Sequence, residues 1–359
     1  MTTRREASVT EKLQHVGDQE PLNLAAVLRF MHESLPDPPE HLTAQRFGGG
    51  SSNLTYLLTD GEREWVLRRP PSGPLLPTAH DMAREYRVLS ALATTDVPVA
   101  RPLALCTDHS VLGATFYLME RRRGFIVREQ VPPEVGDDVG RRRAVSFAVI
   151  DAMATLHGVD WRTVGLGEGF GKPDGYLERQ LRRWHEQWER SKTQELPVID
   201  QLEAWLAARV PQSPPATIVH GDFRLENCMI DVDSLRVVAI FDWEMSTLGD
   251  PLADLGWALA YWPEATDPPM WRQSMATIST LPGFPTRAEL VARYEAMSGR
   301  SVGAVRFYQV FALYKLAIIA QGIFRRVTGG QIQLAHAHAE HFGDRVAMIA
   351  QTGAEVAAS

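Results

Sequence analysis

A short stretch in the second half of the chain carries acidic and amide side chains at a spacing that could do chemistry. Residues 218–229 read IVHGDFRLENCM, where Asp222 is followed five positions later by Asn227. A second acid, Asp242 in IFDWE, comes at the end of the strand-like run VVAIF. Turn formation could explain each residue by itself, because Asp and Asn side chains bond to nearby backbone. Three such groups in this order indicate a single chemical site.

Groups of this kind suit phosphoryl transfer from a nucleotide, which depends on positioned groups more than on covalent chemistry of the protein. We expect Asp222 to accept the proton of an acceptor hydroxyl, and Asn227 and Asp242 to bind Mg²⁺ through oxygen atoms. Because Mg²⁺ keeps phosphate oxygens and water in its shell, one amide and one carboxylate are enough protein ligands. His220 is expected to hold the loop in place.

Two further features upstream could bind the phosphates. The segment GGGSSN lies between two expected strands, and its backbone N–H groups could surround anionic oxygens, although a plain turn is an alternative. The next strand, WVLRRP, ends in Arg68 and Arg69, and Glu85 on the following helix could pair with one of them. An exposed surface pair is the alternative. The glycine-rich segment consists of Gly48, Gly49, Gly50, Ser51, Ser52 and Asn53.

The elements that must position these groups fall into three regions. Residues 1–40 contain one amphipathic helix, LNLAAVLRFMHESL, which PDPP stops. Residues 41–120 are rich in strands, with Asp60-Gly61 as a hairpin turn and AHDMAREYRVLSALA as a helix. From residue 121 the chain reads as mostly helical, interrupted by the strand-rich stretch at 218–244. This order predicts an α+β protein with a cleft between a small β-rich part and a larger helical part.

Composition limits the classes of protein that fit. The 359 residues are 45% hydrophobic and 23% charged, which is typical of an ordinary globular protein. A net charge of −7 argues against a large nucleic-acid-binding surface. The two cysteines, Cys106 and Cys228, suit a reducing compartment, and we find no signal peptide and no stretch with the apolar length of a spanning helix. We expect a cytoplasmic monomer or homodimer that acts on a small-molecule alcohol and binds neither nucleic acid nor a membrane.

Two motifs carry a resemblance to a known family. HGDFRLEN and the following FDWEMSTLGDPLADLGW resemble the aminoglycoside phosphotransferase and choline kinase-like family, a small-molecule branch of the protein-kinase-like fold. VLRRPPSGPLLPTAHDMAREYRVLSAL and GYLERQLRRWHEQW are similar to the kinase domain fused to some eukaryotic acyl-CoA dehydrogenases. The likeness covers about residues 30–345. It implies a two-lobed fold, with a small antiparallel-sheet N-lobe at 1–120 and a larger helical C-lobe at 121–359.

Carried over by position, the resemblance implies an ATP-dependent phosphotransferase with Asp222 as base and Mg²⁺ on Asn227 and Asp242. The segment FYLMERRRG matches the hinge between the lobes. Because a hinge contacts the base through backbone, GTP is left open beside ATP. The other implied residues are Gly48 to Asn53 over the phosphates, Arg68 with Glu85, Met119 beside the adenine, Glu120 and Arg122 on its edge through their backbones, and Asp254 as a brace of the catalytic loop.

One position departs from the wider kinase fold. The strand-three lysine is replaced by Arg68, with Arg69 next to it, and the sequence leaves open which of them pairs with Glu85. A guanidinium is permanently charged and can bind phosphate with two hydrogen bonds, so the function can survive the change. The chain has no APE-like element and no long activation segment, which argues against a protein substrate.

The acceptor is expected to be anionic or partly apolar, for instance a hydroxyacyl thioester of coenzyme A. Arginines between the hinge and the catalytic loop favour this class over polycationic aminoglycosides. The alternative is that these arginines are solvated and that Trp184 and Trp188 are core residues. The arginines concerned are Arg121 to Arg123, Arg141 to Arg143, Arg179, Arg182 and Arg183.

Two other classes of function fit parts of the sequence. A pseudokinase would bind a nucleotide and regulate a partner without turnover; the missing lysine favours it, whereas the presence of Asp222, Asn227 and Asp242 speaks against it. A metal-dependent hydrolase would need more His and Asp ligands than this stretch supplies. The triplet His336, His338 and His341 is expected to be solvated or to cap a helix, because these offsets do not share one helical face.

Overall fold

The computed structural model describes residues 13–15, 22–48, 53–71, 81–167, 169–274, 277–330 and 336–359. For residues 13–15, 274 and 336–342 it describes the backbone alone. The N-terminal part is a six-stranded sheet in the order β1-β2-β3-β4-β6-β5, with every neighbouring pair antiparallel. Its strands are β1 (Leu13–His15), β2 (Thr43–Phe47), β3 (Leu54–Thr59), β4 (Glu64–Arg69), β5 (Pro102–Cys106) and β6 (Phe116–Glu120).

The expected hairpin turn joins β3 to β4. Asp60 Oδ1 accepts hydrogen bonds from the backbone N–H groups of Glu62 at 3.0 Å and Arg63 at 2.7 Å. Gly61 adopts a φ of +97°, which L side chains rarely adopt. This turn sets the register that puts Thr55 opposite Arg68.

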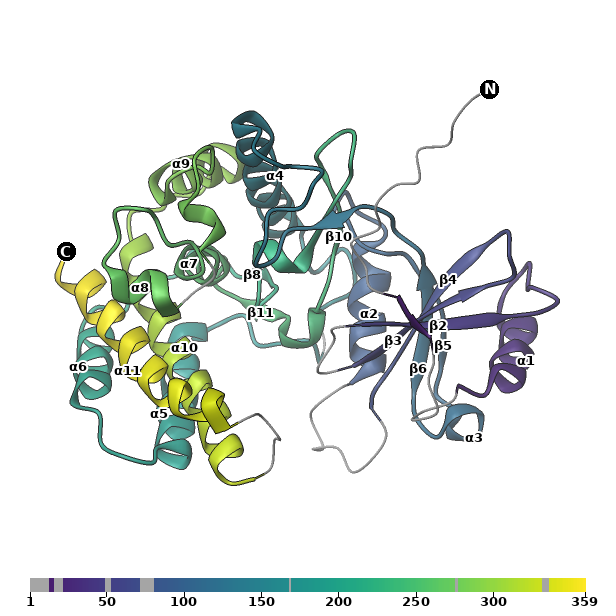
Figure 1. Ribbon diagram of the computed structural model, residues 1–359, viewed down its shortest axis with the longest axis horizontal. Coiled ribbons are helices and arrows are strands. Elements are labelled where there is room, and N and C mark those ends of the chain that lie inside the picture. The colour runs from purple at the N-terminus through teal and green to yellow at the C-terminus, as the bar shows by residue number, and fades with distance from the viewer. Residues whose placement is uncertain are drawn as a thin grey trace.

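Alternation along β6 divides the sheet between two helices. Phe116 and Leu118 pack with Val27 and Met31 of α1 (Leu24–Ser34), whereas Tyr117 and Met119 belong to the cluster that contains α2 (Met82–Leu92). Successive strand side chains point to opposite faces, so both faces of the sheet are covered. Asn23 and Asp81 cap the two helices by accepting N–H bonds. Figure 1 shows α2 between the sheet and the helical part.

The C-terminal part is mainly helical and holds two small antiparallel sheets, β10-β9-β7 and β11-β8. Both sheets lie on the side of the helices that faces the N-terminal part (Figure 1). The short helix α3 (His109–Leu112) still belongs to the N-terminal part, between β5 and β6. The helices of the C-terminal part are α4 (Val139–Gly158), α5 (Tyr176–Ser191), α6 (Pro197–Ala207), α7 (Leu252–Ala260), α8 (Pro269–Ser274), α9 (Arg287–Ser298), α10 (Val305–Thr328) and α11 (His336–Ala358). The strands are β7 (Phe125–Ile126), β8 (Thr217–Val219), β9 (Cys228–Ile230), β10 (Val237–Ile240) and β11 (Thr247–Gly249), with 3₁₀ turns η1 (Leu225–Asn227), η2 (Trp243–Met245) and η3 (Ile278–Thr280).

Helix α10 corrects one expectation. By length and composition it could cross a membrane, although the sequence reading found no stretch of that kind. Within the fold, 67% of the apolar 18-residue stretch of this helix is buried, and α10 packs against α5, α6, α7 and α11. Helix α10 is thus a core helix. Lys315 lies near the middle of this helix.

The α+β architecture, with a small antiparallel sheet ahead of a larger helical part, is confirmed. Both cysteines are buried and free. The last strand of the six-stranded sheet ends at Glu120, and β7 already belongs to another sheet. The division of the chain into lobes at residue 120 stays a prediction.

Candidate active site

The motif HGD forms a tight turn directly after β8. Gly221 has a φ of +86°, and a Cβ built on it would lie 2.8 Å from the carbonyl oxygen of Met245. Glycine is therefore required for both the conformation and the space. His220 is fully buried; its Nδ1 accepts from the Asp222 N–H at 3.2 Å and its Nε2 lies 2.8 Å from the Phe241 carbonyl oxygen. As expected, the imidazole holds the loop.

Asp222 and Asn227 lie side by side. The Asn227 Nδ2 donates to Asp222 Oδ2 at 2.9 Å and to the Asp222 carbonyl oxygen at 2.8 Å. Asp222 Oδ1 accepts from the indole Nε1 of Trp257 at 2.6 Å and lies 3.3 Å from Arg224 Nε. Since the amide nitrogen of Asn227 is engaged, its Oδ1 is the atom that would serve as a metal ligand.

Asp242 completes the oxygen donor set from the end of β10. It adopts a left-handed φ of +67°, and its Oδ1 lies 3.4 Å from Arg68 Nη2. The Phe241 N–H donates to the Asn227 carbonyl at 2.8 Å, which ties the two ligand-bearing segments together. One carboxylate and one amide oxygen of this kind fit a hard divalent cation such as Mg²⁺. In the part of the chain that the structure describes, no three His, Cys, Asp or Glu side chains group as a metal cluster.

The open question of the arginine is resolved in favour of Arg68. Its Nε donates to Glu85 Oε2 at 3.1 Å, and Glu85 is only 3% exposed, so this is a buried pair rather than a surface one. Arg69 instead donates from Nε to the Pro70 carbonyl oxygen at 3.2 Å. Burial by itself would lower the pKa of Arg68, but the charge of Glu85, with smaller contributions from other acids, holds it above its usual value.

A network of buried side chains around Asp254 supports the loop that carries Asp222. Asp254 Oδ2 accepts from the His220 N–H at 2.7 Å and faces His157 Nε2 at 3.2 Å, while its Oδ1 accepts from the Gly221 N–H at 2.8 Å. His157 Nδ1 lies 2.7 Å from the hydroxyl of Tyr294 on α9. Burial opposes the charge of Asp254, yet bonding to His157 and the loop holds its pKa below the ordinary value. Asp254 has the bracing position expected from the sequence.

A cleft of about 430 Å³ lies between the sheet and the catalytic loop. It brings together most of the residues that the sequence predicted, from both parts of the chain. Gly49, Gly50, Ser51 and Ser52 lie outside the described residues, as do the side chains of His336, His338 and His341. Asp222 and Glu85 adjoin the cleft through Asn227 and Arg68. The predicted residues that line it are Gly48, Asn53, Arg68, Met119, Glu120, Arg122, Asn227 and Asp242.

The arginines of the first run, Arg121 to Arg123, differ in their exposure and contacts. The Arg121 side chain is 13% exposed, lines the cleft and lies over the Phe47 ring at 4.9 Å. The Arg123 side chain is 76% exposed and pairs with Glu64 at 2.8 Å. Arg46 and Arg128 also line the cleft, which the sequence reading missed.

The second arginine run is structural. Arg142 is buried and donates to the carbonyl oxygens of Gly136 and Pro282 at 2.9 and 2.8 Å. Arg179 of α5 likewise donates to the carbonyl oxygens of Lys172 and Asp174, in the loop before this helix. Trp184 and Trp188 are buried, so the alternative that placed the tryptophans in the core is confirmed.

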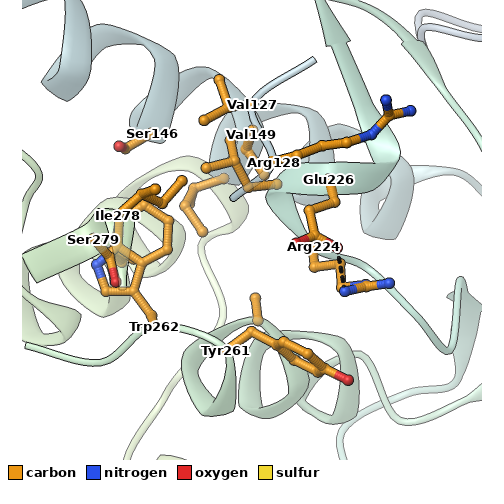
Figure 2. A pocket seen from close by; sticks show the side chains of 14 residues that line it. Val127, Arg128, Ser146, Val149, Arg224, Glu226, Tyr261, Trp262, Ile278 and Ser279 are labelled. Carbon is orange, nitrogen blue, oxygen red and sulfur yellow. Dashed lines mark hydrogen bonds and ion pairs between the residues drawn. The ribbon is translucent and has the colours of Figure 1, made fainter. Parts of the chain in front are cut away.

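A second, mainly apolar pocket of about 40 Å³ opens behind the catalytic loop (Figure 2). Figure 2 shows Arg128, Arg224 and Glu226 on one side of it and Trp262, Ile278 and Ser279 on the other. The three residues on the first side also line the cleft, so the two spaces are adjacent. The apolar wall consists of Val127, Val149, Ile150, Leu225, Ala258, Trp262, Ile278 and Leu290.

Three residues around Asp222 were missed as site residues. Trp257 donates to its carboxylate, and Arg224 faces the same oxygen. Lys315 donates from Nζ to the Gly221 carbonyl oxygen at 3.0 Å. The available signals were Arg224 inside the motif itself, Trp257 at the end of GDPLADLGW, and a single lysine inside the apolar stretch FALYKLAIIA.

The fold and this arrangement define a kinase-like phosphotransferase architecture, and sequence comparison agrees. The profile of the phosphotransferase enzyme family matches residues 43–294, so the chain belongs to that family. A solved structure from Ralstonia eutropha, assigned as an aminoglycoside phosphotransferase, is 35% identical with a TM-score of 0.81 over 94% of this chain and 98% of its own. A choline kinase from Cryptosporidium parvum, 11% identical, shares the fold with a TM-score of 0.62 over 92% of this chain and 95% of its own.

The chain also matches parts of longer proteins. Acyl-CoA dehydrogenase family member 11 of Gallus gallus is 34% identical over 96% of this chain and 44% of that protein. Family member 10 of Mus musculus is 37% identical over 81% of this chain and 27% of that protein. The chain thus spans less than half the length of these relatives.

An aminoglycoside phosphotransferase solved with AMP-PNP and hygromycin B, 16% identical with a TM-score of 0.59 over 92% of this chain and 99% of its own, shows the shared fold.

Proposed function

We propose that this protein is an ATP-dependent phosphotransferase that moves the γ-phosphoryl group to a hydroxyl of a small molecule. Asp222 accepts the proton of the hydroxyl, the acceptor oxygen forms a bond to phosphorus, and the bond to the leaving ADP oxygen breaks. Asn227 Oδ1 and Asp242 would hold Mg²⁺, which supplies positive charge to the phosphates when it is bound. Met119, Glu120 and Arg122 would receive the base at the far end of the cleft.

The observation that carries this proposal is the joint position of Asp222, Asn227 and Asp242 beside Arg68. Glu85, 17 positions after Arg68, and Asp242, 174 positions after it, both contact the Arg68 guanidinium. Arg68 thereby links the sheet to the segment that carries Asp242. An arginine fork suits phosphate oxygens, and a carboxylate that already accepts two side-chain hydrogen bonds is fixed in direction. A related fold that holds AMP-PNP supports nucleotide binding in this cleft.

For the acceptor we propose a hydroxyacyl-CoA or another alcohol with anionic and apolar parts. The apolar pocket next to the catalytic loop could receive a hydrocarbon portion (Figure 2). Arg128 and Arg224 at its mouth could meet negative charge. The names of the longer relatives concern acyl-CoA, which agrees with this class of acceptor.

The experiment that tests the proposal is phosphoryl transfer detected by mass spectrometry. Wild-type protein and the variant Asp222→Asn are each incubated with Mg·ATP and a set of hydroxyacyl-CoA thioesters that differ in the position of the hydroxyl, beside a metabolite extract. We expect an ion that gains one phosphoryl group only with the wild type. A matched control is Asp233→Asn, since Asp233 is exposed in the β9–β10 loop.

The same samples separate the alternatives. Mg·ATP that raises the melting temperature without any phosphorylated product or ADP would favour the pseudokinase. A product from the metabolite extract but from none of the thioesters would keep the phosphotransferase and overturn the acyl-CoA acceptor. No stabilisation by Mg·ATP and no product would overturn the proposal as a whole.

A further inference from the structure

Lysine is rare in this chain and one lysine lies against the catalytic loop. Only Lys12, Lys172, Lys192 and Lys315 occur among the 37 residues that are Lys or Arg. Lys315 belongs to α10, a core helix whose neighbours in sequence are largely buried. A cation buried in such a helix costs free energy unless its contacts compensate for lost water. Its contacts therefore need an explanation.

Two of those contacts lead to Asp222. The Nζ donates to the carbonyl oxygen of Gly221, the residue immediately before Asp222, at 3.0 Å. The same ammonium lies 4.0 Å from the ring centre of Trp257, whose indole N–H donates to Asp222 Oδ1 at 2.6 Å. Trp184 provides a second ring at 5.6 Å. An ammonium on the face of an indole is attracted by the ring quadrupole. Lys315 thus contacts both the residue before Asp222 and an indole that bonds to its carboxylate.

We propose that Lys315 is a positioning residue for phosphoryl transfer, holding the Gly221 carbonyl and the Trp257 indole so that the Asp222 carboxylate keeps the direction needed to accept a proton. This role rests on the proposed function of Asp222 as base. Lys315 is separated from both predicted metal ligands: it comes from α10, contacts Gly221 and Trp257, and acts through them.

The surroundings explain why a lysine rather than an arginine occupies this position. The space beside Nζ is about 10 Å³, close to the minimum for one water molecule, and is lined by Tyr176, Gly221, Trp257 and Phe311 among others. A compact ammonium suits this space better than a planar guanidinium. Unlike arginine, lysine can lose its proton when it is buried.

The charges that face Lys315 come from three other elements. Burial lowers its pKa to about 8, with Arg183 of α5 acting in the same direction. Asp222 in the catalytic loop and Asp254 in α7 act in the opposite direction. Tyr176 of α5 lines the same small cavity and has a pKa raised by burial, so it is neutral in this range. Lys315 is charged below about pH 8 and neutral above it, so the support of Asp222 weakens as the pH rises.

The first test does not depend on turnover. Solvent exchange of the Trp257 indole hydrogen, identified with Trp257→Phe, reports on its bond to Asp222. We expect exchange to be roughly tenfold faster in Lys315→Met than in the wild type, to be partly restored in Lys315→Arg, and to be unchanged in Lys172→Met, a lysine remote from the loop in sequence. Equal exchange in Lys315→Met and the wild type would overturn the proposal.

The second test follows ADP release from Mg·ATP between about pH 6.5 and 9.5, with water as the acceptor. Four lysines give a simple ¹³Cε-lysine spectrum, so the pKa of Lys315 is measured directly in the same samples. We expect the wild-type rate to fall with that pKa, Lys315→Arg to lack the fall, and Lys315→Met to be slower at all pH values by roughly 10- to 100-fold. Identical pH profiles of the wild type and Lys315→Arg would overturn the proposal.

The two tests also separate this proposal from the proposed function. A wild type that releases no ADP with every acceptor overturns the proposed function, and with it the catalytic purpose of Lys315. The exchange measurement then still decides whether Lys315 sets the Trp257–Asp222 bond. Circular dichroism of each variant checks that the helical part is folded.

Discussion

The two sides of the cleft are built in opposite ways. On the side of the catalytic loop, Asp254 and His157 are each 1% exposed, and their polar atoms are bonded within the protein. On the side of the sheet, Arg68 and Arg121 have side chains 15% and 13% exposed and line open space. In the described contacts Arg68 donates to Glu85 and Asp242, and a guanidinium has five N–H groups.

This difference separates two tasks. The position of Asp222, the proposed proton acceptor, is fixed by the fold before any ligand arrives, because burial makes every broken bond in its support costly. Arg68 keeps donor capacity that a polyphosphate could use. Substitutions on the loop side should therefore change turnover, and also folding stability where they break a buried bond of the support, whereas those on the sheet side should change nucleotide affinity. Four predictions test this division.

The largest effect is expected for Asp222→Asn. Phosphoryl transfer should fall by about 10²- to 10⁴-fold, the range for loss of a general base. The melting temperature and its increase with Mg·ATP should change little, because Asn keeps a carbonyl oxygen for the Trp257 indole. Steady-state kinetics with a thermal-shift titration measure both. Loss of Mg·ATP binding together with turnover would break the division of tasks.

Asp254→Asn should affect turnover and stability together. Removing the charge from a carboxylate that serves His157, His220 and Gly221 should lower the free energy of unfolding by about 3 kcal/mol. Because the pKa of Asp254 is depressed in the folded protein, its stabilisation is complete above the unfolded pKa near 4 and is lost as the pH falls through the lower folded value. Urea unfolding from about pH 2 to 7 should show a flatter acid limb in the variant. An unchanged acid limb would contradict the brace.

Replacing the pair Arg68 and Glu85 together by methionine should weaken Mg·ATP binding by roughly 10- to 100-fold, the equivalent of one charge-assisted contact. The double change avoids leaving Glu85 buried without its partner. Isothermal titration calorimetry gives the affinity, and Arg68→Lys shows how much the charge alone restores. Equal affinity in the double variant and the wild type would mean that this arginine does not meet phosphate.

The smallest effect is expected for nucleotide affinity when Arg121 and Arg123, two members of one run of arginines, are replaced in turn. Arg121→Ala should weaken nucleotide binding about threefold to tenfold, since Arg121 lies over Phe47 at the cleft. Arg123→Ala should change it by less than about twofold, because Arg123 is exposed and only pairs with Glu64 at the surface. The same calorimetric titration compares the two. Equal losses would show that overall charge, rather than position, matters.

The sequence predicted contacts between residues that lie close together in the chain. Asp222 and Asn227 are five residues apart in one loop, so their spacing already implied contact, and the alternation in β3 to β6 implied the sheet. The choice between Arg68 and Arg69 needed the structure, because adjacent strand residues face opposite sides and the sequence alone does not say which side meets α2. Lys315 is 94 positions from Gly221. No periodicity indicates which turn of a buried helix meets a distant loop, so this contact could not be predicted.

The left-handed backbone at Asp242 has an evolutionary consequence. Asp242 and Leu235 are the non-glycine residues with positive φ in the described part of the chain. Asparagine and glycine tolerate this conformation at least as well as aspartate, so mutation to either would remove the proposed metal-binding carboxylate without adding backbone strain. A duplicated copy of this gene could thus lose catalysis at this position without losing its fold. Descendants that bind nucleotides but no longer turn them over are one substitution away.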